Sequence, residues 1–479
     1  MSPITVFIVV FGYFGLLILV SWLTSRHADN QSFFNANKAA PWYLVAFGMI
    51  GATLSGVTFI SVPGEVGKSA FSYLQFVMGN FVGYWIIAFV LLPVYYRLNL
   101  VSIYSFLKER FGIRSQKTGS LFFIISKVIG AAFRLYLVAG VLQIAFFGPL
   151  GIPFSVTVCT SIFLIWVYTF KGGIKTIVWT DTLQTFFLVS AVIFTVYMIS
   201  SDLNWSFGQA VKAISEHEYS QIFFWDWRSP NNFFKQFFAG MFMTIVITGM
   251  DQDMMQKNLS CKNKFESRKN MLVFSFLFVF TVTLFLGLGV LLYIFAGKRD
   301  IAIPAVTDNL YPLLALNNLG ILVGIAFLLG ITSAAYSSAD SALTALTTSF
   351  CIDFLPYESY GEKKKKNIRR LVHLGFSVIL IIVILLFKVL NNESVVVAVF
   401  KAAGYTYGPI LGLFSFGLLT KRRVNEKKVP LVAVLAPVSC YFLSLFSEQV
   451  FCGYKFGFEL LIMNGLLTFA GLWLFSKKS

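Results

Sequence analysis

Four oxygen-bearing side chains recur at helical spacing in one apolar stretch of the sequence. They are Ser337, Asp340, Ser341 and Thr344. Residues spaced i, i+3, i+4 and i+7 share one face of an α-helix. Hard cations prefer oxygen ligands, so this face predicts a cation site. Helix packing is the alternative, because Ser and Thr also bond between helices, but packing does not explain Asp340.

A second stretch, residues 48–58, combines three glycines with hydroxyl side chains inside an apolar run. Close packing between helices would explain the glycines. The same composition suits a helix that is unwound at membrane depth, where freed carbonyl groups could coordinate an ion. The residues alone leave both interpretations open.

Charged side chains inside apolar segments are a third signal. They are Lys127, Arg134, Asp181 and Asp340. A charge at the centre of a bilayer costs at least ~2.5–3.5 kcal/mol, so such residues are candidates for function. The alternative is that they pair with one another and fix helix packing.

The composition shows what kind of chain must position these residues. Of 479 residues, 57% are hydrophobic and only 12% are charged, about half the charged fraction of soluble domains, which is roughly 25%. This excludes an ordinary cytosolic enzyme and a disordered chain. The sequence also lacks the HExxH and GxSxG motifs of two large enzyme classes. We therefore expect an all-α integral membrane protein that is not an enzyme.

Thirteen apolar runs are long enough to cross a bilayer core of about 30 Å. They lie near residues 4–24, 41–67, 72–97, 117–147, 153–171, 174–201, 233–250, 268–296, 319–350, 368–390, 394–419, 428–447 and 457–475.

The net charge of +17 fits this arrangement. If the N-terminus is outside and the C-terminus is cytoplasmic, most Lys and Arg residues fall in the inner loops, as the positive-inside rule requires. Lys257 counts as one of these loop charges. Such a bias needs no nucleic acid partner, so the expected surroundings are the lipid bilayer.

Five motifs occur in a consistent order along the chain. They span residues 102–112, 172–184, 251–260, 334–341 and 407–414. With thirteen spans, these motifs make the sequence similar to the sodium:solute symporter family over nearly its whole length. The resemblance implies sodium-driven uptake of a small solute by alternating access in a bacterial inner membrane, with a single chain sufficient for transport.

The resemblance also implies a LeuT-like fold with two inverted five-helix repeats in one transporter domain, residues 1–479. One helix would precede the repeats, at about 4–24. The repeats would cover about 41–201 and 233–419, and two helices would follow at about 428–475.

Matching the family residue by residue implies sodium ligands. The first site would use the carbonyls of Gly51, Leu54 and Ala334 and the hydroxyls of Ser337 and Ser338. A second, tentative site would use Asp181, Ser337, Asp340 and Ser341. The carboxylate of Asp340 stands where the resemblance suggests a serine, and it would either strengthen this second site or pair with Lys127 or Arg134.

The residues expected to bind substrate most resemble those of bacterial sialic acid symporters. They are Thr53, Ser55, Thr58, Phe71, Gln75 and Arg134. An arginine fork suits a carboxylate, and hydroxyl and amide groups suit a polyol. The prediction is therefore sodium symport of a sialic acid or another sugar acid. A neutral sugar, inositol or a monocarboxylate is the alternative substrate, a packing role is the alternative for Arg134, and a channel is the alternative class of protein.

Overall fold

Thirteen helical segments in the described part of the chain match the thirteen predicted spans. The structure is a computed structural model that describes residues 3–25, 30–169, 173–390, 395–451, 453–454 and 456–477. Seven helices are long and apolar enough to cross a membrane, two further spans are bent helix pairs, and four are shorter apolar helices. The predicted span ends at residues 171 and 394 lie outside the described residues.

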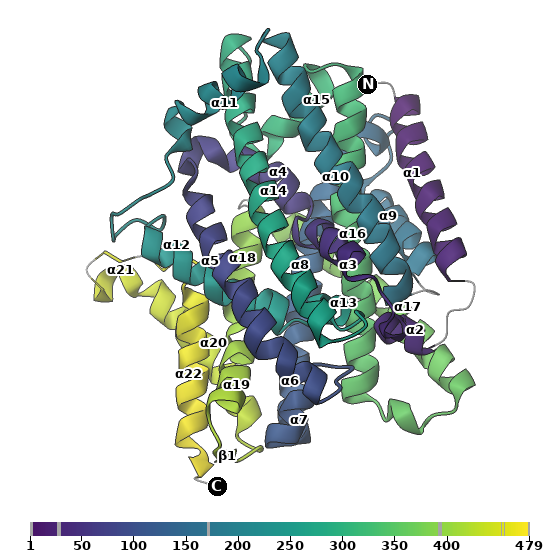
Figure 1. Cartoon of the computed structure of the whole chain (residues 1–479), viewed down its shortest axis with the longest axis vertical. Helices are drawn as coiled ribbons and strands as arrows, with labels where there is room; N and C mark the ends of the chain where they lie inside the picture. The colour runs from purple at the N-terminus through teal and green to yellow at the C-terminus, as the bar shows by residue number, and fades with distance from the viewer. Residues whose placement is uncertain are drawn as a thin grey trace.

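The long helices and the shorter apolar helices follow one another along the chain (Figure 1). The long ones are α1 (Pro3–Thr24), α5 (Ser72–Ile86) with its continuation α6 (Leu92–Arg97), α8 (Ile113–Leu142), α10 (Ile174–Asp202), α14 (Lys264–Lys298), α16 (Ile321–Phe354) and α17 (Glu362–Leu390). The shorter ones are α9 (Phe154–Thr169), α19 (Gly408–Leu419) directly after α18 (Val395–Thr406), α20 (Val429–Leu445) and α22 (Leu460–Leu474).

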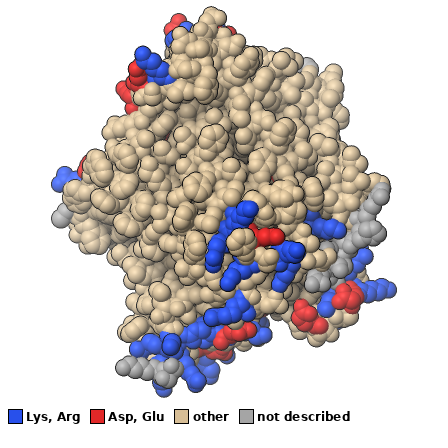
Figure 2. All heavy atoms as spheres, in the orientation of Figure 1, with Lys and Arg blue, Asp and Glu red and all other residues tan. Residues whose placement is uncertain are grey.

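Short elements connect the spans. The helices are α2 (Asn30–Asn35), α7 (Ser105–Phe111), α11 (Phe207–Ser215), α15 (Leu310–Asn317) and α21 (Ser447–Val450). Two-residue strands, β1 (Arg423–Val424) and β2 (Ser476–Lys477), pair antiparallel. The two ends of the chain lie at opposite ends of the molecule in Figure 1, and most Lys and Arg residues visible in Figure 2 gather in its lower half, towards the C-terminal end.

The first broken span confirms the unwound helix suggested by residues 48–58. Helix α3 (Trp42–Thr53) ends where Leu54 and Ser55 leave helical geometry, and α4 (Gly56–Ser69) begins after them. The two halves meet at a bend of 56°. The Ile50 carbonyl still accepts the Leu54 N–H at 2.7 Å, but the carbonyl groups after it have lost the regular amide partners that a continuous helix would supply.

The second broken span corrects the sequence analysis. The predicted seventh span ended near residue 250, but it continues through a bend of 69° into α13 (Gln252–Asn258) after α12 (Phe233–Thr244) and a π-helical turn at Ile245–Gly249. Asp251 caps α13 by accepting hydrogen bonds from the backbone N–H groups of the next turn. Each break lies in the first span of a predicted repeat, although the division into repeats stays a prediction.

Glycines allow close approach where the broken spans pack. The backbone N–H of Gly51 in α3 donates to the Thr185 hydroxyl of α10 at 2.9 Å, and a Cβ at Gly51 would lie 2.5 Å from that oxygen. Helices α5 and α12 are also in backbone contact, since a Cβ at Gly240 would overlap the carbonyl oxygen of Phe76. Small residues at these positions hold both broken spans against their neighbours.

Candidate functional site

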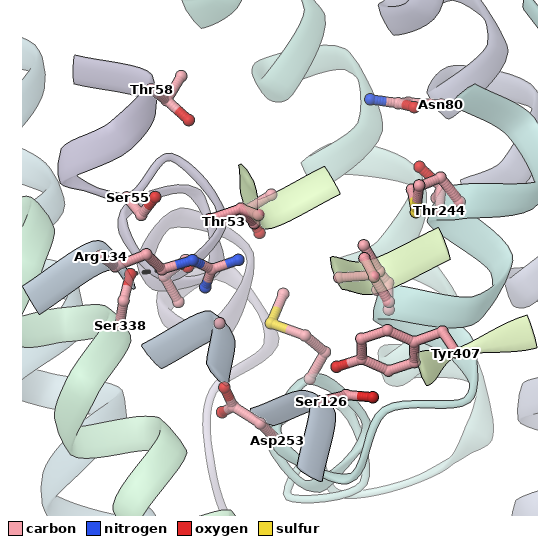
Figure 3. Close-up of a pocket in the computed structure, with 18 of the residues that line it drawn as sticks. Thr53, Ser55, Thr58, Asn80, Ser126, Arg134, Thr244, Asp253, Ser338 and Tyr407 are labelled. Carbon is pink, nitrogen blue, oxygen red and sulfur yellow. Dashed lines mark hydrogen bonds between the residues drawn. The ribbon is translucent and has the colours of Figure 1, made fainter. Parts of the chain in front are cut away.

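A cavity lies beside the break between α3 and α4 (Figure 3). Its walls come from that break, from α5, α8, α12, α13 and α16, and from the region of α18 and α19. The polar side chains that line it include Thr53, Ser55, Thr58, Ser126, Arg134, Asp253, Ser338 and Tyr407. Apolar side chains such as Val62, Phe76 and Met243 complete the lining. This combination suits a small solute with several polar groups.

Two cationic side chains of α8 line this cavity, Lys127, which is paired with aspartates, and Arg134. The guanidinium group of Arg134 points into the space beside Thr53 and Ser55 in Figure 3. No carboxylate lies within ion-pairing distance of Arg134 in the part of the chain that the structure describes. The planar fork is therefore available to a ligand carboxylate, which it can bind through two parallel hydrogen bonds.

The predicted substrate residues divide into two groups. Thr53, Ser55, Thr58 and Arg134 line the cavity, whereas Phe71 and Gln75 are buried outside its lining. The Gln75 amide is held by a loop: it donates to a backbone carbonyl at 2.9 Å and accepts a backbone N–H at 3.2 Å. The roles of all six residues in substrate binding stay predictions.

Part of the first predicted sodium site comes together at the end of α3. The Ser338 hydroxyl of α16 lies 3.3 Å from the Ala52 carbonyl oxygen and 3.2 Å from that of Ala334. Gly51 and Leu54 flank Ala52 at the break. Helix α16 therefore presents a hydroxyl group to the carbonyls freed by the break, and such clustered oxygens suit a hard cation.

The second predicted sodium site contains a lysine that the sequence analysis did not place there. The Ser337 hydroxyl donates to Asp181 Oδ1 at 2.6 Å. Asp181 Oδ2 faces the ammonium group of Lys257, whose Nζ lies 2.7 Å away. Asp340 accepts hydrogen bonds from Tyr168 at 2.9 Å and from Ser341 at 3.2 Å.

Lys257 was counted among the charges of an inner loop, but the structure places it in a helix. It lies in α13 and is only 1% exposed. The one available sequence signal was its spacing four residues after Asp253, which suggests a helix carrying an ion pair. The partner on α10 could not be found from such local spacing, because it is distant in the sequence.

Lys127 of α8 pairs with two aspartates at the start of α13, the helix that also carries Lys257. Its Nζ lies 2.7 Å from Asp253 Oδ2 and 3.3 Å from Asp251 Oδ1. Asp251 also accepts a hydrogen bond from the Tyr407 hydroxyl at 2.6 Å. Of the two roles considered for Asp340, pairing with Lys127 or Arg134 is therefore not found, since neither cation is within ion-pairing distance of it in the described structure.

Comparison with known proteins links this chain to transporters. The model of the Sodium:solute symporter family matches residues 33–428. The sodium/sialic acid symporter NanT of Aliivibrio fischeri is 25% identical over 455 residues, which cover 90% of this chain and 86% of that protein. The sodium/sialic acid symporter SiaT of Proteus mirabilis is 24% identical over 448 residues, with coverage of 89% and 88%.

A solved structure shows the same fold. A Na+-coupled sialic acid symporter, in a substrate-bound outward-open state, aligns with a TM-score of 0.83 and 20% identity over 99% of each chain. The prediction of a LeuT-like transporter fold is thereby confirmed.

Proposed function

The chain belongs to the sodium:solute symporter family and is a sodium-coupled membrane transporter, not an enzyme; from this premise we propose that its substrate is a small sugar acid, with sialic acid as the first candidate. Two relatives named sodium/sialic acid symporters support this substrate class, and the chain aligns with 86% and 88% of their lengths. The protein would import the solute by alternating access, using the inward sodium gradient.

The main support for a sugar-acid substrate is the position of Arg134 in the cavity. A half-buried guanidinium in a polar cavity needs an anionic partner, and the two nearby lysines already have partners on α13 and α10. A substrate carboxylate would supply the missing partner. The hydroxyl groups of Thr53 and Ser55 beside it could then bond to the polyol part of a sugar acid.

The first sodium site would lie at the break of the second span. We place its ligands at the carbonyls of Gly51, Leu54 and Ala334 and at the hydroxyls of Ser337 and Ser338. The position of the Ser338 hydroxyl against the end of α3 supports this set. A sodium ion there would join α16 to the substrate-binding break, so occupying the site would favour the conformation that binds substrate.

We further propose that the protein spans the bacterial inner membrane with its N-terminus outside and its C-terminus in the cytoplasm. The opposite positions of the termini and the gathering of basic side chains towards the C-terminal end support this topology (Figures 1 and 2). One chain would suffice for transport, because a single chain supplies both the cavity and the proposed sodium ligands.

Uptake by purified protein in liposomes tests the proposed substrate. With an inward sodium gradient, labelled sialic acid should accumulate above its external concentration. Replacing sodium with potassium should abolish accumulation. Unlabelled glucose, inositol and short monocarboxylates should compete poorly. Accumulation of one of these solutes without accumulation of sialic acid would overturn the substrate assignment, and simple equilibration without accumulation would point to a channel.

A further inference from the structure

We propose that the ammonium group of Lys257 is the resident cation of the pocket formed by Asp181 and Asp340, so that the protein couples transport to one sodium ion per cycle. This is the pocket in which the sequence resemblance suggested a second sodium ion. The inference rests on the sodium coupling and on the first sodium site proposed above.

The contacts of Lys257 place its charge inside the pocket. The side chain is buried, and its Nζ lies 2.7 Å from Asp181 Oδ2 and 3.9 Å from Asp253 Oδ1. The other oxygen of Asp181 accepts the Ser337 hydroxyl at 2.6 Å. Both oxygens of Asp181 are therefore engaged, one by a hydroxyl group and one by a cation.

A sodium ion bound to the same carboxylate would meet the ammonium group at close range. Oxygen ligands of hard cations lie at about 2.3–2.6 Å, so an ion on Asp181 Oδ2 would be a near neighbour of Nζ. Two like charges repel strongly in a buried, low-dielectric site. Sodium could bind there only if Lys257 withdrew, and withdrawal would leave a buried ammonium without its partner, which is costly.

Asp340 is the second acidic residue of this pocket, although the ion pairs of Lys257 in the described structure are with Asp181 and Asp253. Its carboxylate is fully buried and interacts electrostatically with both Asp181 and Lys257. Its oxygens are oriented by the hydroxyl groups of Tyr168 and Ser341. A second carboxyl group therefore adds oxygen atoms to this pocket at a position where the family resemblance suggests a serine.

The position of Lys257 on a different helix from the two aspartates matters for the transport cycle. Lys257 belongs to α13, the second half of a broken span, whereas Asp181 belongs to α10 and Asp340 to α16. A tethered cation can move with its helix but cannot dissociate into the cytoplasm. The pocket would therefore be neutralised in every cycle without consuming a sodium ion.

Counting bound sodium tests the proposal without any substrate. Equilibrium binding of 22Na+ to the purified protein should saturate at one ion per chain, with a Hill coefficient of 1. Lys257→Gln should bind two ions, because the pocket loses its resident cation, whereas Lys257→Arg should still bind one. Two ions bound to the wild-type protein would overturn the proposal, and so would one ion bound to a folded Lys257→Gln variant.

A second measurement keeps the proposal testable if Lys257→Gln fails to fold. One sodium ion moving with one monovalent anionic substrate carries no net charge, so the initial uptake rate should not respond to a membrane potential set with potassium and valinomycin. Stimulation of sialic acid uptake by an inside-negative potential would contradict single-sodium coupling. Absence of sialic acid uptake from a protein that binds one sodium ion would count against the proposed substrate alone.

Discussion

At the scale of single residues, the partners of three cations decide what each cation can do. Lys127 and Lys257 face aspartates of their own chain at 2.7 Å, so their charges are already compensated. Arg134 points into the cavity beside hydroxyl groups. All three residues lie in or beside apolar stretches, and of the three only Arg134 has no carboxylate within ion-pairing distance in the described structure, which is why we propose it as the group that binds an external anion.

Arg134→Ala should weaken binding of an anionic sugar by about tenfold or more, because a hydrogen bond to a charged group contributes about 1.5–3 kcal/mol. Isothermal titration of the purified variant with sialic acid measures the change. Arg299→Ala is a matched control, since Arg299 is exposed and pairs with Asp202 away from the cavity. A packing role for Arg134 would be favoured if Arg134→Ala and Arg299→Ala weakened sialic acid binding equally. It would also be favoured if Arg134→Ala weakened the binding of a neutral sugar as much as that of sialic acid.

Ser338→Ala should raise the sodium concentration for half-maximal uptake several-fold, because it removes one proposed oxygen ligand worth about 1 kcal/mol. Uptake measured over a series of sodium concentrations tests this. Ser275→Ala provides the comparison, because that buried hydroxyl bonds only to the Leu272 carbonyl of its own helix in the described structure. An unchanged sodium requirement in Ser338→Ala would contradict the proposed site.

At the scale of elements, the two broken spans differ in how clearly the sequence indicates each break. The first break shows as glycines and hydroxyl side chains in residues 48–58. The second shows as the onset of charged residues after residue 250, which resembles the end of a span. Charges can continue inside the protein here because Asp251 and Asp253 are paired with Lys127 of α8.

Gly240→Ala should destabilise the packing of α12 on α5, because the added methyl group would overlap the Phe76 carbonyl oxygen. Overpacking of this kind costs about 1–3 kcal/mol, so the melting temperature of the detergent-purified protein should fall by several degrees. Gly12→Ala serves as the control, since a Cβ at Gly12 in α1 would have no atom within 4 Å. A similar melting temperature for both variants would show that the two helices can separate at little cost.

At the scale of the whole molecule, the proposed odd number of spans would place the two termini on opposite sides of the membrane. Thirteen segments in the described residues and the positions of the termini in Figure 1 agree on this point. In the proposed topology the basic side chains mark the cytoplasmic side, because Lys and Arg are retained there during insertion.

Reporter fusions test the proposed orientation. Green fluorescent protein fused after the C-terminus should fluoresce, and alkaline phosphatase fused at the same place should be inactive, because the junction is expected in the cytoplasm. Fusion of each reporter in the loop between α10 and α12 should give the opposite pattern. Active phosphatase at the C-terminus would reverse the assigned orientation.

The sequence by itself determined the membrane class and the order of the apolar helical segments, and it offered the first break as one of two interpretations. Each of these depends on local composition, since transfer of apolar side chains into lipid and the loss of helical hydrogen bonds act within one segment. The motifs also pointed to the family. They could not reveal that Lys257 lies beside Asp181 or that the loop near Asn231 holds Gln75 away from the cavity lining.

Only the tertiary structure decided how the buried charges are paired. Asp181, Asp340 and Lys257 come from three helices that are far apart in the sequence, and no local periodicity relates them. A buried charge is stabilised by the group that reaches it in three dimensions. For this reason the candidate residues could be read from the sequence, while the cation that fills the acidic pocket required the fold.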